Sequence, residues 1–232
     1  MKEKVLLAFS GGLDTSFCAM YLAQEKGYEV HTAVANTGGF SAEELKVIED
    51  KAYRLGAASH VALDVTQEYY DKSIKYMVFG NVLRNGTYPI SVSSERIFQA
   101  IAIINYAKEI GAEYVAHGST GAGNDQVRFD LTFDVIAPEI KILTPTRDMV
   151  LTREYEINYL RDHGFDADFK KMEYSINKGL WGTSIGGKET LKSEQTLPEE
   201  AYPSQVEKQG EETVTIGFEN GEICSINGST NE

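Results

Sequence analysis

Residues 5–16 read Val-Leu-Leu-Ala-Phe-Ser-Gly-Gly-Leu-Asp-Thr-Ser, an apolar run followed at once by a glycine-rich turn. The continuous run Val5–Phe9 is typical of a strand that is buried on both faces. Apolar residues recur at helical spacing from residue 15 to 26, and Gly27 is placed to end that helix. The stretch therefore predicts a strand, a tight turn and a helix, the unit from which parallel α/β sheets are built.

The same unit recurs along the chain. Ser41 with Glu44 three residues later is a capping box that starts the second helix. Further strands are expected at residues 30–35, 59–65, 114–116 and 140–143, and helices at 41–55, 67–79, 94–110, 124–135 and 153–163. Crossover connections between parallel strands place helices on both faces of a sheet. We therefore expect an α/β fold with a doubly wound parallel five-stranded sheet, whose turns meet in one crevice beyond the carboxyl ends of the strands.

The pattern changes after about residue 151. Residues 173–209 are polar and predict irregular structure, whereas residues 213–218 and 223–226 flank Asn220-Gly221, the strongest short signal for a β-hairpin. Two strands alone are marginal in water, so this hairpin needs more sheet than we expect the chain to supply. We predict one domain over residues 1–165 and an incomplete second α+β domain over residues 166–232.

Composition excludes several classes of protein. The 232 residues carry a formal charge of -13, and residues 194–232 hold nine glutamates against one lysine, so nonspecific nucleic-acid binding is not expected. No apolar run approaches the roughly 18 residues of a membrane span, and none suits a signal peptide. Cys18 and Cys224 have no metal-ligand spacing. We expect a cytoplasmic protein with no membrane and no nucleic acid among its partners.

The turn after the first strand has the composition of an anion-binding loop. Its glycines let backbone N–H groups approach phosphate oxygens, the hydroxyls of Ser10, Thr15 and Ser16 add donors, and the helix N-terminus adds partial positive charge. The loop has no lysine and no G-x-G-x-x-G spacing, so it is neither a Walker loop nor a Rossmann loop. The alternative is a plain strand-to-helix turn with Asp14 as a favourable first-turn acid. Asp14 beside phosphates predicts an intervening cation such as Mg²⁺.

The loop resembles the pyrophosphate-binding loop of the ATP pyrophosphatase superfamily, whose members cleave ATP between the α and β phosphates. A second stretch, residues 117–129, reads His-Gly-Ser-Thr-Gly-Ala-Gly-Asn-Asp-Gln-Val-Arg-Phe. It resembles the signature of the argininosuccinate synthase family. The resemblance implies a fold of the adenine nucleotide alpha hydrolase type. It also implies a ligase of arginine biosynthesis that joins L-citrulline to L-aspartate through a citrullyl-adenylate, with ATP as substrate and AMP and pyrophosphate as products.

The resemblance also implies site residues at the matching positions. ATP is expected at Ala8, Phe9, Ser10, Gly11, Gly12, Leu13, Asp14, Thr15, Ser16, Ala35, His117 and Gly118. Citrulline is expected at Tyr88, Ser93, Asn124, Arg128, Ser175 and Ser184, and aspartate at Thr120, Asn124 and Asp125. No residue is expected to act as a covalent nucleophile, and metal ligands stay undefined. Positioning of the reactants must then supply most of the rate, on the order of 7 to 11 kcal/mol.

Structural explanations compete with several of these roles. Asp125 could cap the helix near Asn124, and Arg128 could pair with Asp125 across one helical turn. A Tyr-Pro turn followed by a serine cap would explain Tyr88 and Ser93. His117 could be a hydrogen bonder at a strand end, and we assign it no role in proton transfer.

Two other functions remain open. Another pyrophosphatase-loop adenylating enzyme would show catalytic cysteines or a basic RNA surface, and a non-catalytic module would bind ATP without releasing AMP. Members of the family continue well beyond residue 232, and the resemblance implies a homotetramer for the full-length protein. We expect residues 1–232 to hold ATP and most of the amino-acid site.

Overall fold

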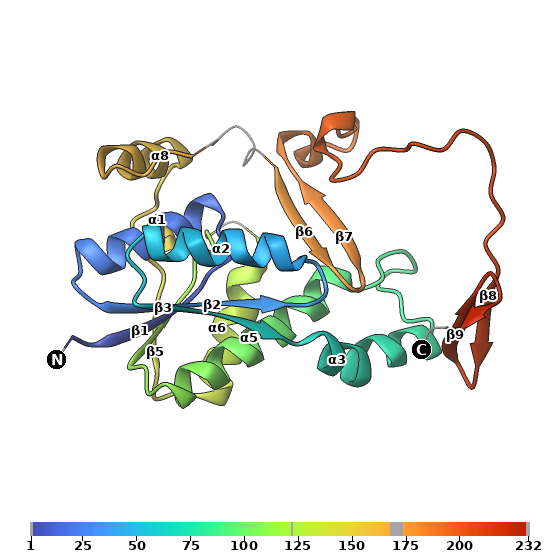
Figure 1. Ribbon diagram of the computed structural model, residues 1–232, viewed down its shortest axis with the longest axis horizontal. Coiled ribbons are helices and arrows are strands. Elements are labelled where there is room, and N and C mark those ends of the chain that lie inside the picture. The colour runs from blue at the N-terminus through green and yellow to red at the C-terminus, as the bar shows by residue number, and fades with distance from the viewer. Residues whose placement is uncertain (1, 122, 168–173, 231–232) are drawn as a thin grey trace.

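The computed structural model describes residues 2–121, 123–167 and 174–230, and a five-stranded parallel sheet lies at its centre (Figure 1). Its strands are β1 (Lys4–Ala8), β2 (Glu29–Asn36), β3 (Ser59–Asp64), β4 (Tyr114–Ala116) and β5 (Lys141–Leu143). They are ordered β3-β2-β1-β4-β5, and every neighbouring pair is parallel. The predicted α/β fold and its five strands are confirmed.

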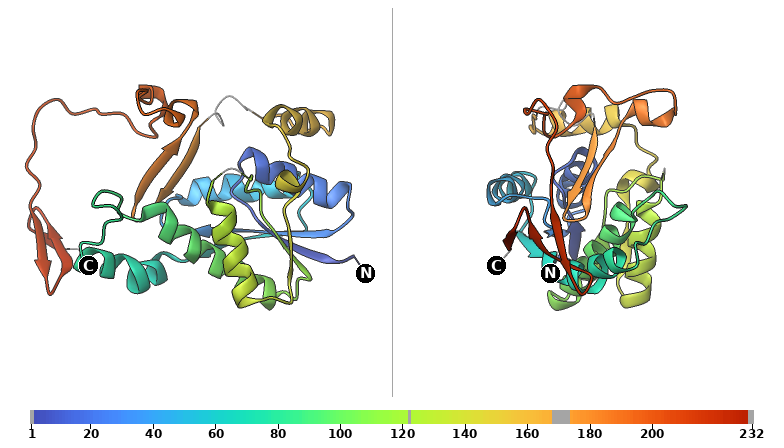
Figure 2. Two further views of the ribbon diagram at one scale, coloured as in Figure 1. Left: turned by 180° about the vertical axis from the view of Figure 1, so that it is seen from behind. Right: turned by 90° about the vertical axis from the view of Figure 1, so that its right-hand side faces the viewer.

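Helices cover both faces of the sheet (Figures 1 and 2). On one side lie α1 (Leu13–Gln24), α2 (Ala42–Arg54) and α8 (Arg153–Asp162), and on the other α5 (Ser91–Glu109) and α6 (Asp125–Ile136). In β1, Val5 and Leu7 belong to the first of these cores and Leu6 to the second, and all three are 0% exposed. The apolar run therefore fills a strand that is buried on both faces, as its sequence predicts.

The chain reverses direction across the sheet between β1 and β4. It runs from β1 outward to β2 and β3 and then returns to the other side of β1 for β4 and β5. The loops that leave β1 and β4 therefore start from adjacent strands and diverge toward opposite faces, which opens a crevice between them.

Two predicted helices differ in detail. The segment expected to form one helix at residues 67–79 consists of α3 (Thr66–Tyr69), a π-helical turn η1 (Tyr70–Ile74) and α4 (Lys75–Phe79). Helix α5 starts at Ser91, before the expected residue 94, directly after Ile90 in the left-handed region at φ 59°. A short helix, α7 (Pro145–Asp148), was not expected. Within the described ranges, no helix has the length and apolar character needed to cross a membrane.

The prediction of irregular structure at residues 173–209 is wrong in part. Strands β6 (Ser175–Gly179) and β7 (Gly182–Gly186) form an antiparallel hairpin, and the short helices η3 (Lys188–Leu191) and η4 (Glu199–Ala201) follow. These strands lack a regular apolar alternation, so their pattern does not reveal them. Contacts at the hairpin tip hold them instead: Leu180 N donates to the carbonyl oxygen of Thr37 at 2.8 Å, and Trp181 Nε1 donates to that of Pro89 at 2.7 Å.

The C-terminal hairpin is confirmed, but its first strand begins at residue 216 and not at the predicted residue 213, and a third strand extends the sheet. Strands β8 (Ile216–Glu219) and β9 (Glu222–Ile226) flank Asn220 and Gly221, both of which have positive φ. A third strand, β10 (Ser229–Thr230), pairs with β9 after a second Asn-Gly turn. The chain thus supplies part of the additional sheet that a two-stranded hairpin needs. That second Asn-Gly pair was the signal that the sequence carried for β10.

Candidate functional site

A cavity of about 810 Å³ lies at the carboxyl ends of β1, β2 and β4. Its walls come from the loop after β1, the end of β2, one face of α5, the loop after β4 with the start of α6, and strand β6. This is the crevice that the strand order predicts. A second, apolar cavity of about 160 Å³ lies between α4, the tip of the β6–β7 hairpin and β9, away from these residues.

The structure brings most of the expected site residues to this one cavity. Eleven of the twelve expected ATP residues line it, namely Ala8, Phe9, Ser10, Gly11, Gly12, Leu13, Asp14, Thr15, Ala35, His117 and Gly118. The cavity is also lined by the three residues expected to bind aspartate, Thr120, Asn124 and Asp125, and by Ser175, which is expected to bind citrulline. Among the described residues, five expected members lie outside the lining: Ser16, Tyr88, Ser93, Arg128 and Ser184. Ala122 of the second motif lies outside the described ranges.

The loop after β1 is held open at the N-terminus of α1. Gly11 lies in the left-handed region at φ 74°, and Gly12 occupies the N-cap without a side-chain hydrogen bond to the first helical turn. Ser16 Oγ and Thr15 Oγ1 both donate to the Gly12 carbonyl, at 2.7 and 3.3 Å. Gly12 has no side chain that could cap the first turn of α1, which leaves the N–H groups of that turn available to an anion.

A lysine reaches this loop from another element. Lys51 on α2 donates from Nζ to the Gly11 carbonyl at 2.7 Å. Burial lowers the pKa of this amine, and the nearby charge of Arg54 lowers it further. The loop motif itself contains no lysine, so nothing in its spacing connects residue 51 with it. The fold supplies the positive charge from 40 residues away.

The turn after β2 is a rigid neighbour of the loop. Asn36 Oδ1 accepts hydrogen bonds from the backbone N–H groups of Gly38, Gly39 and Phe40, at 3.0, 3.2 and 3.3 Å. This arrangement is an Asx-type turn, in which a short amide side chain replaces a backbone partner. Ala35 is thereby fixed in the cavity wall.

Both ring nitrogens of His117 make hydrogen bonds. Its Nδ1 accepts the backbone N–H of Ser119 at 3.1 Å, so the ring proton is on Nε2, which donates to Asp130 Oδ1 at 2.7 Å. Arg147 binds the other oxygen of Asp130 at 2.7 Å. Burial favours the protonated form of Asp130, yet the hydrogen bonds from His117 and Arg147 outweigh burial and lower its pKa. The two hydrogen bonds of the histidine orient the loop after β4.

Asp125 sits between two arginines. Arg128 binds its Oδ1 at 2.6 Å, and Arg96 Nε binds its Oδ2 at 3.1 Å. The pairing of Arg128 with Asp125 across one turn is therefore real. The capping alternative for Asp125 is wrong, because Asn124 is the N-cap and makes no side-chain capping bond.

The remaining citrulline candidates form two groups. Tyr88 Oη accepts the backbone N–H of Ser93 and lies 3.2 Å from its Oγ. The pKa of Tyr88 is lowered overall: burial favours the neutral phenol, but the hydrogen bonds with Ser93 and the charge of Arg128 prevail. In the hairpin, Ser184 pairs with Asn177 and therefore shares a face with Asn177 and Ser175.

Sequence reasoning missed one face of α5. Glu95, Arg96, Gln99 and Ile103 recur at helical spacing and line the cavity. Polar residues at positions 95, 96 and 99 of a helix that is otherwise largely apolar were the available signal.

Comparison with known proteins agrees with this geometry. Residues 4–166 match the family model described as the arginosuccinate synthase N-terminal HUP domain. Similar proteins include the argininosuccinate synthases of Methanocaldococcus jannaschii (40% identity, 98% of this chain), Xanthomonas campestris pv. campestris (40%, 97%) and Saccharolobus solfataricus (37%, 99%). The chain covers 58% of the length of each of these relatives.

Proposed function

This chain belongs to the argininosuccinate synthase family, and on that basis we propose that it binds ATP and takes part in the ligation of L-citrulline to L-aspartate. The reaction would release AMP and pyrophosphate, with a citrullyl-adenylate as intermediate. The bounds 1–165 for an ATP-binding domain and 166–232 for part of a second domain belong to the same proposal.

One observation carries the proposal. Three stretches that are far apart in sequence, the loop after β1, the loop after β4 and strand β6, line a single cavity. The first has an uncapped helix N-terminus and hydroxyl side chains suited to a pyrophosphate. The others contribute an acid, amides and hydroxyls suited to amino-acid ligands.

In the proposed chemistry, the ureido oxygen of citrulline attacks the α-phosphate of ATP, and pyrophosphate leaves. The amine of aspartate then displaces AMP. The chain's own residues would orient these groups: the loop after β1 holds the phosphates, and Thr120, Asn124 and Asp125 hold aspartate. The role of Arg128, Tyr88 and Ser93 toward citrulline rests on the sequence resemblance, since they lie outside the cavity lining.

Mg²⁺ fits the site as a partner of the nucleotide. Asp14 is the carboxylate of the loop, and the described residues contain no group of three or more histidine, cysteine or acidic side chains that could hold a metal ion. Phosphate oxygens and water would therefore supply most of its ligands, and Asp14 would add a carboxylate from the loop. When bound, Mg²⁺ would neutralise phosphate charge as pyrophosphate leaves.

The test supplies ATP, Mg²⁺, citrulline and aspartate, omits each in turn, and measures AMP and pyrophosphate. We expect ATP binding by calorimetry, and AMP formation only when citrulline is present. AMP released without citrulline would sink the ligase proposal in favour of another adenylating enzyme. ATP binding with no AMP under any condition would indicate a binding module.

A further inference from the structure

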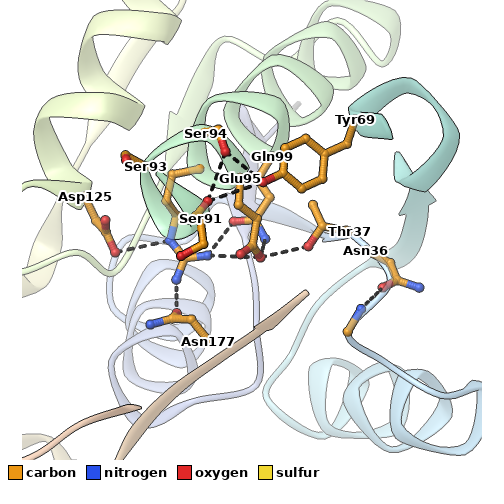
Figure 3. A network of polar contacts seen from close by, with 12 residues as sticks. Asn36, Thr37, Tyr69, Ser91, Ser93, Ser94, Glu95, Gln99, Asp125 and Asn177 are labelled. Atoms are coloured by element: carbon orange, nitrogen blue, oxygen red, sulfur yellow. Dashed lines mark hydrogen bonds and ion pairs between the residues drawn. The ribbon is translucent and has the colours of Figure 1, made fainter. Parts of the chain in front are cut away.

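Two charged neighbours on α5 lie in the wall of the cavity: Glu95 is buried and Arg96 is partly buried. Figure 3 shows Glu95 with Thr37 and Gln99 beside it. Glu95 is 4% exposed, and the side chain of Arg96 is 13% exposed. Buried charges are costly unless they are paired and hydrogen-bonded, so their contacts indicate what they hold in place.

Glu95 holds the residue that anchors the β6–β7 hairpin. Its Oε1 accepts hydrogen bonds from Thr37 Oγ1 at 2.8 Å and from Gln99 Nε2 at 2.9 Å. Thr37 directly follows β2, and its carbonyl accepts the backbone N–H of Leu180 at the hairpin tip. One side chain of α5 is thus linked through Thr37 to the hairpin.

The hairpin backbone also packs directly on this carboxylate. A β-carbon added to Gly179 would lie 3.0 Å from Glu95 Cδ, 3.1 Å from its Oε2 and 3.1 Å from Thr37 Oγ1. On the other side, a β-carbon added to Gly39 would overlap the Lys178 carbonyl. The hairpin therefore sits against the end of β2 with no room for a side chain at the contact.

Arg96 makes the second link. One of its guanidinium nitrogens donates to Asn177 Oδ1 on β6, while its Nε binds Asp125 at the start of α6. A third nitrogen donates to Gln99 Oε1 at 2.8 Å. Arg96 thereby bridges the hairpin and the loop after β4, the two amino-acid walls of the cavity.

We propose that Glu95 and Arg96 are positioning residues that seat the β6–β7 hairpin against β2 and α6 and so close one wall of the cavity. The seating itself follows from the contacts. Its consequence for citrulline and aspartate rests on the proposed function.

A tryptophan at the hairpin tip allows the position of the hairpin to be followed by fluorescence. Trp181, at the tip of the hairpin, is the only tryptophan in the sequence. Its Nε1 donates to the carbonyl of Pro89, which lies just before α5. Its emission should move to longer wavelength, and its quenching by acrylamide should rise, when the tip leaves its seat. Measurement of both requires no substrate.

Gly179→Ala and Glu95→Ala are expected to shift the emission and raise the quenching. Gly186→Ala is the control for the first, because among the described residues a β-carbon there meets only Ser175 atoms, at 3.9 Å. Glu109→Ala, at an exposed position of the same helix, is the control for the second. Glu95→Gln should keep an emission and a quenching close to those of the wild type, since its amide oxygen can still accept the hydrogen bond from Thr37.

The double variant Glu95→Ala/Gly179→Ala tests the contact itself. Removal of the carboxylate makes room for the added methyl group, so the double variant should shift less than the sum of the two single shifts. Circular dichroism and melting curves identify variants that fail to fold, and Thr37→Val provides an independent loss of the same hydrogen bond. Wild-type emission in folded Gly179→Ala, Glu95→Ala and Thr37→Val would overturn the proposal.

Kinetic measurements test whether the position of the β6–β7 hairpin affects the proposed reaction. Gly179→Ala should raise the KM for citrulline by up to about 100-fold and that for ATP far less, because a displaced wall misplaces the amino acid. An equal rise in both would count against the positioning role. If the wild-type chain forms no AMP, the proposed function fails while the fluorescence result on the seat still stands.

Discussion

Gly118 shows how closely the two loops of the cavity approach each other. A β-carbon at this position would lie 3.0 Å from the backbone nitrogen of Thr15 and 3.1 Å from the carbonyl carbon of Asp14. Both neighbours are backbone atoms of the phosphate loop, so neither can rotate away as a flexible side chain could. The absence of a side chain at Gly118 therefore allows the loop after β4 to approach the loop after β1.

We predict that Gly118→Ala displaces the phosphate loop and weakens ATP binding by about tenfold or more, equivalent to about 1.4 kcal/mol. Calorimetric titration with ATP measures the effect. Gly121→Ala is the matched control, because a β-carbon there meets no atom of the described residues within 4 Å, its chain neighbours apart. Equal affinities in the two variants would contradict the proposed closeness of the loops.

Glu156 is a second residue whose surroundings decide its chemistry. It is 1% exposed on α8, and its Oε1 has no hydrogen-bond partner in the part of the chain that the structure describes. Its pKa is raised from 4.5 to about 8, chiefly by burial and then by the neighbouring Asp14 carboxylate. The folded protein thus keeps a proton on Glu156 that the unfolded chain has already lost at neutral pH.

This shift makes stability fall as pH rises from about 4.5 to about 8. Below that window Glu156 is protonated in both the folded and the unfolded protein, and above it Glu156 is ionised in both. No further stability is therefore lost above about pH 8. Glu156→Gln cannot ionise and should lose less stability over the window. Each kcal/mol recovered at pH 8 raises Tm by about 2–4 °C in a chain of this size.

Melting temperatures at pH 5 and pH 8 test the prediction. The control is Glu154→Gln, at an exposed position of the same helix, which should follow the wild-type profile. Parallel profiles for Glu156→Gln and the wild type would refute the assignment of the proton.

At the scale of elements, helix α2 acts on the phosphate loop from outside it. The Ser41 and Glu44 capping box starts the helix, and nearly three turns later Lys51 meets the Gly11 carbonyl. The start of the helix could be predicted from sequence, since capping is local. Its contact with the loop could not, since it depends on how α2 packs against the sheet.

We predict that Lys51→Met lowers both the unfolding free energy and the affinity for ATP, because the loop loses a charge-assisted hydrogen bond worth about 1.5–3 kcal/mol. Urea unfolding and ATP titration measure the two effects. Lys46→Met on the same helix is the control, since Lys46 is 63% exposed and its surface ion pairs contribute little. An equal loss in both variants would show that only helix stability had changed.

Hairpins show the same division between local and distant causes. Asn220-Gly221 identifies the β8–β9 turn because both residues must adopt positive φ, which is a local requirement. The β6–β7 hairpin has no such signal, and its strands depend on contacts with Thr37, Glu95 and Arg96. Its existence was decided outside its own sequence.

At the scale of the whole molecule, a long exposed connection separates the C-terminal sheet from the rest of the chain. Residues 203–214 are exposed and form no helix or strand, and they arch away from the body toward β8 (Figure 1). Exposed segments without backbone pairing are preferred sites of proteolysis. The segment contains Glu207, Glu211 and Glu212.

We predict that a glutamate-specific protease cuts first in this connection and leaves a body that still binds ATP. Mass spectrometry of early fragments locates the cuts, and titration of the nicked protein measures binding. The buried Glu95 and Glu156 serve as internal controls that resist cleavage. First cuts before residue 166, or loss of ATP binding on nicking, would contradict this picture.

By itself, the sequence predicted the parallel sheet, the glycine-rich turn after β1 and a crevice at the carboxyl ends of the strands. The strands and turns follow from apolar runs and turn residues, whose causes lie within a few residues of each other, whereas the strand order is known only from the structure. Only the tertiary structure decided that Lys51 reaches Gly11, that Glu156 keeps a proton, and that Arg96 meets Asn177 from 81 residues away. The reason is physical: burial and long-range contacts depend on the packing of whole elements, and no local spacing encodes them.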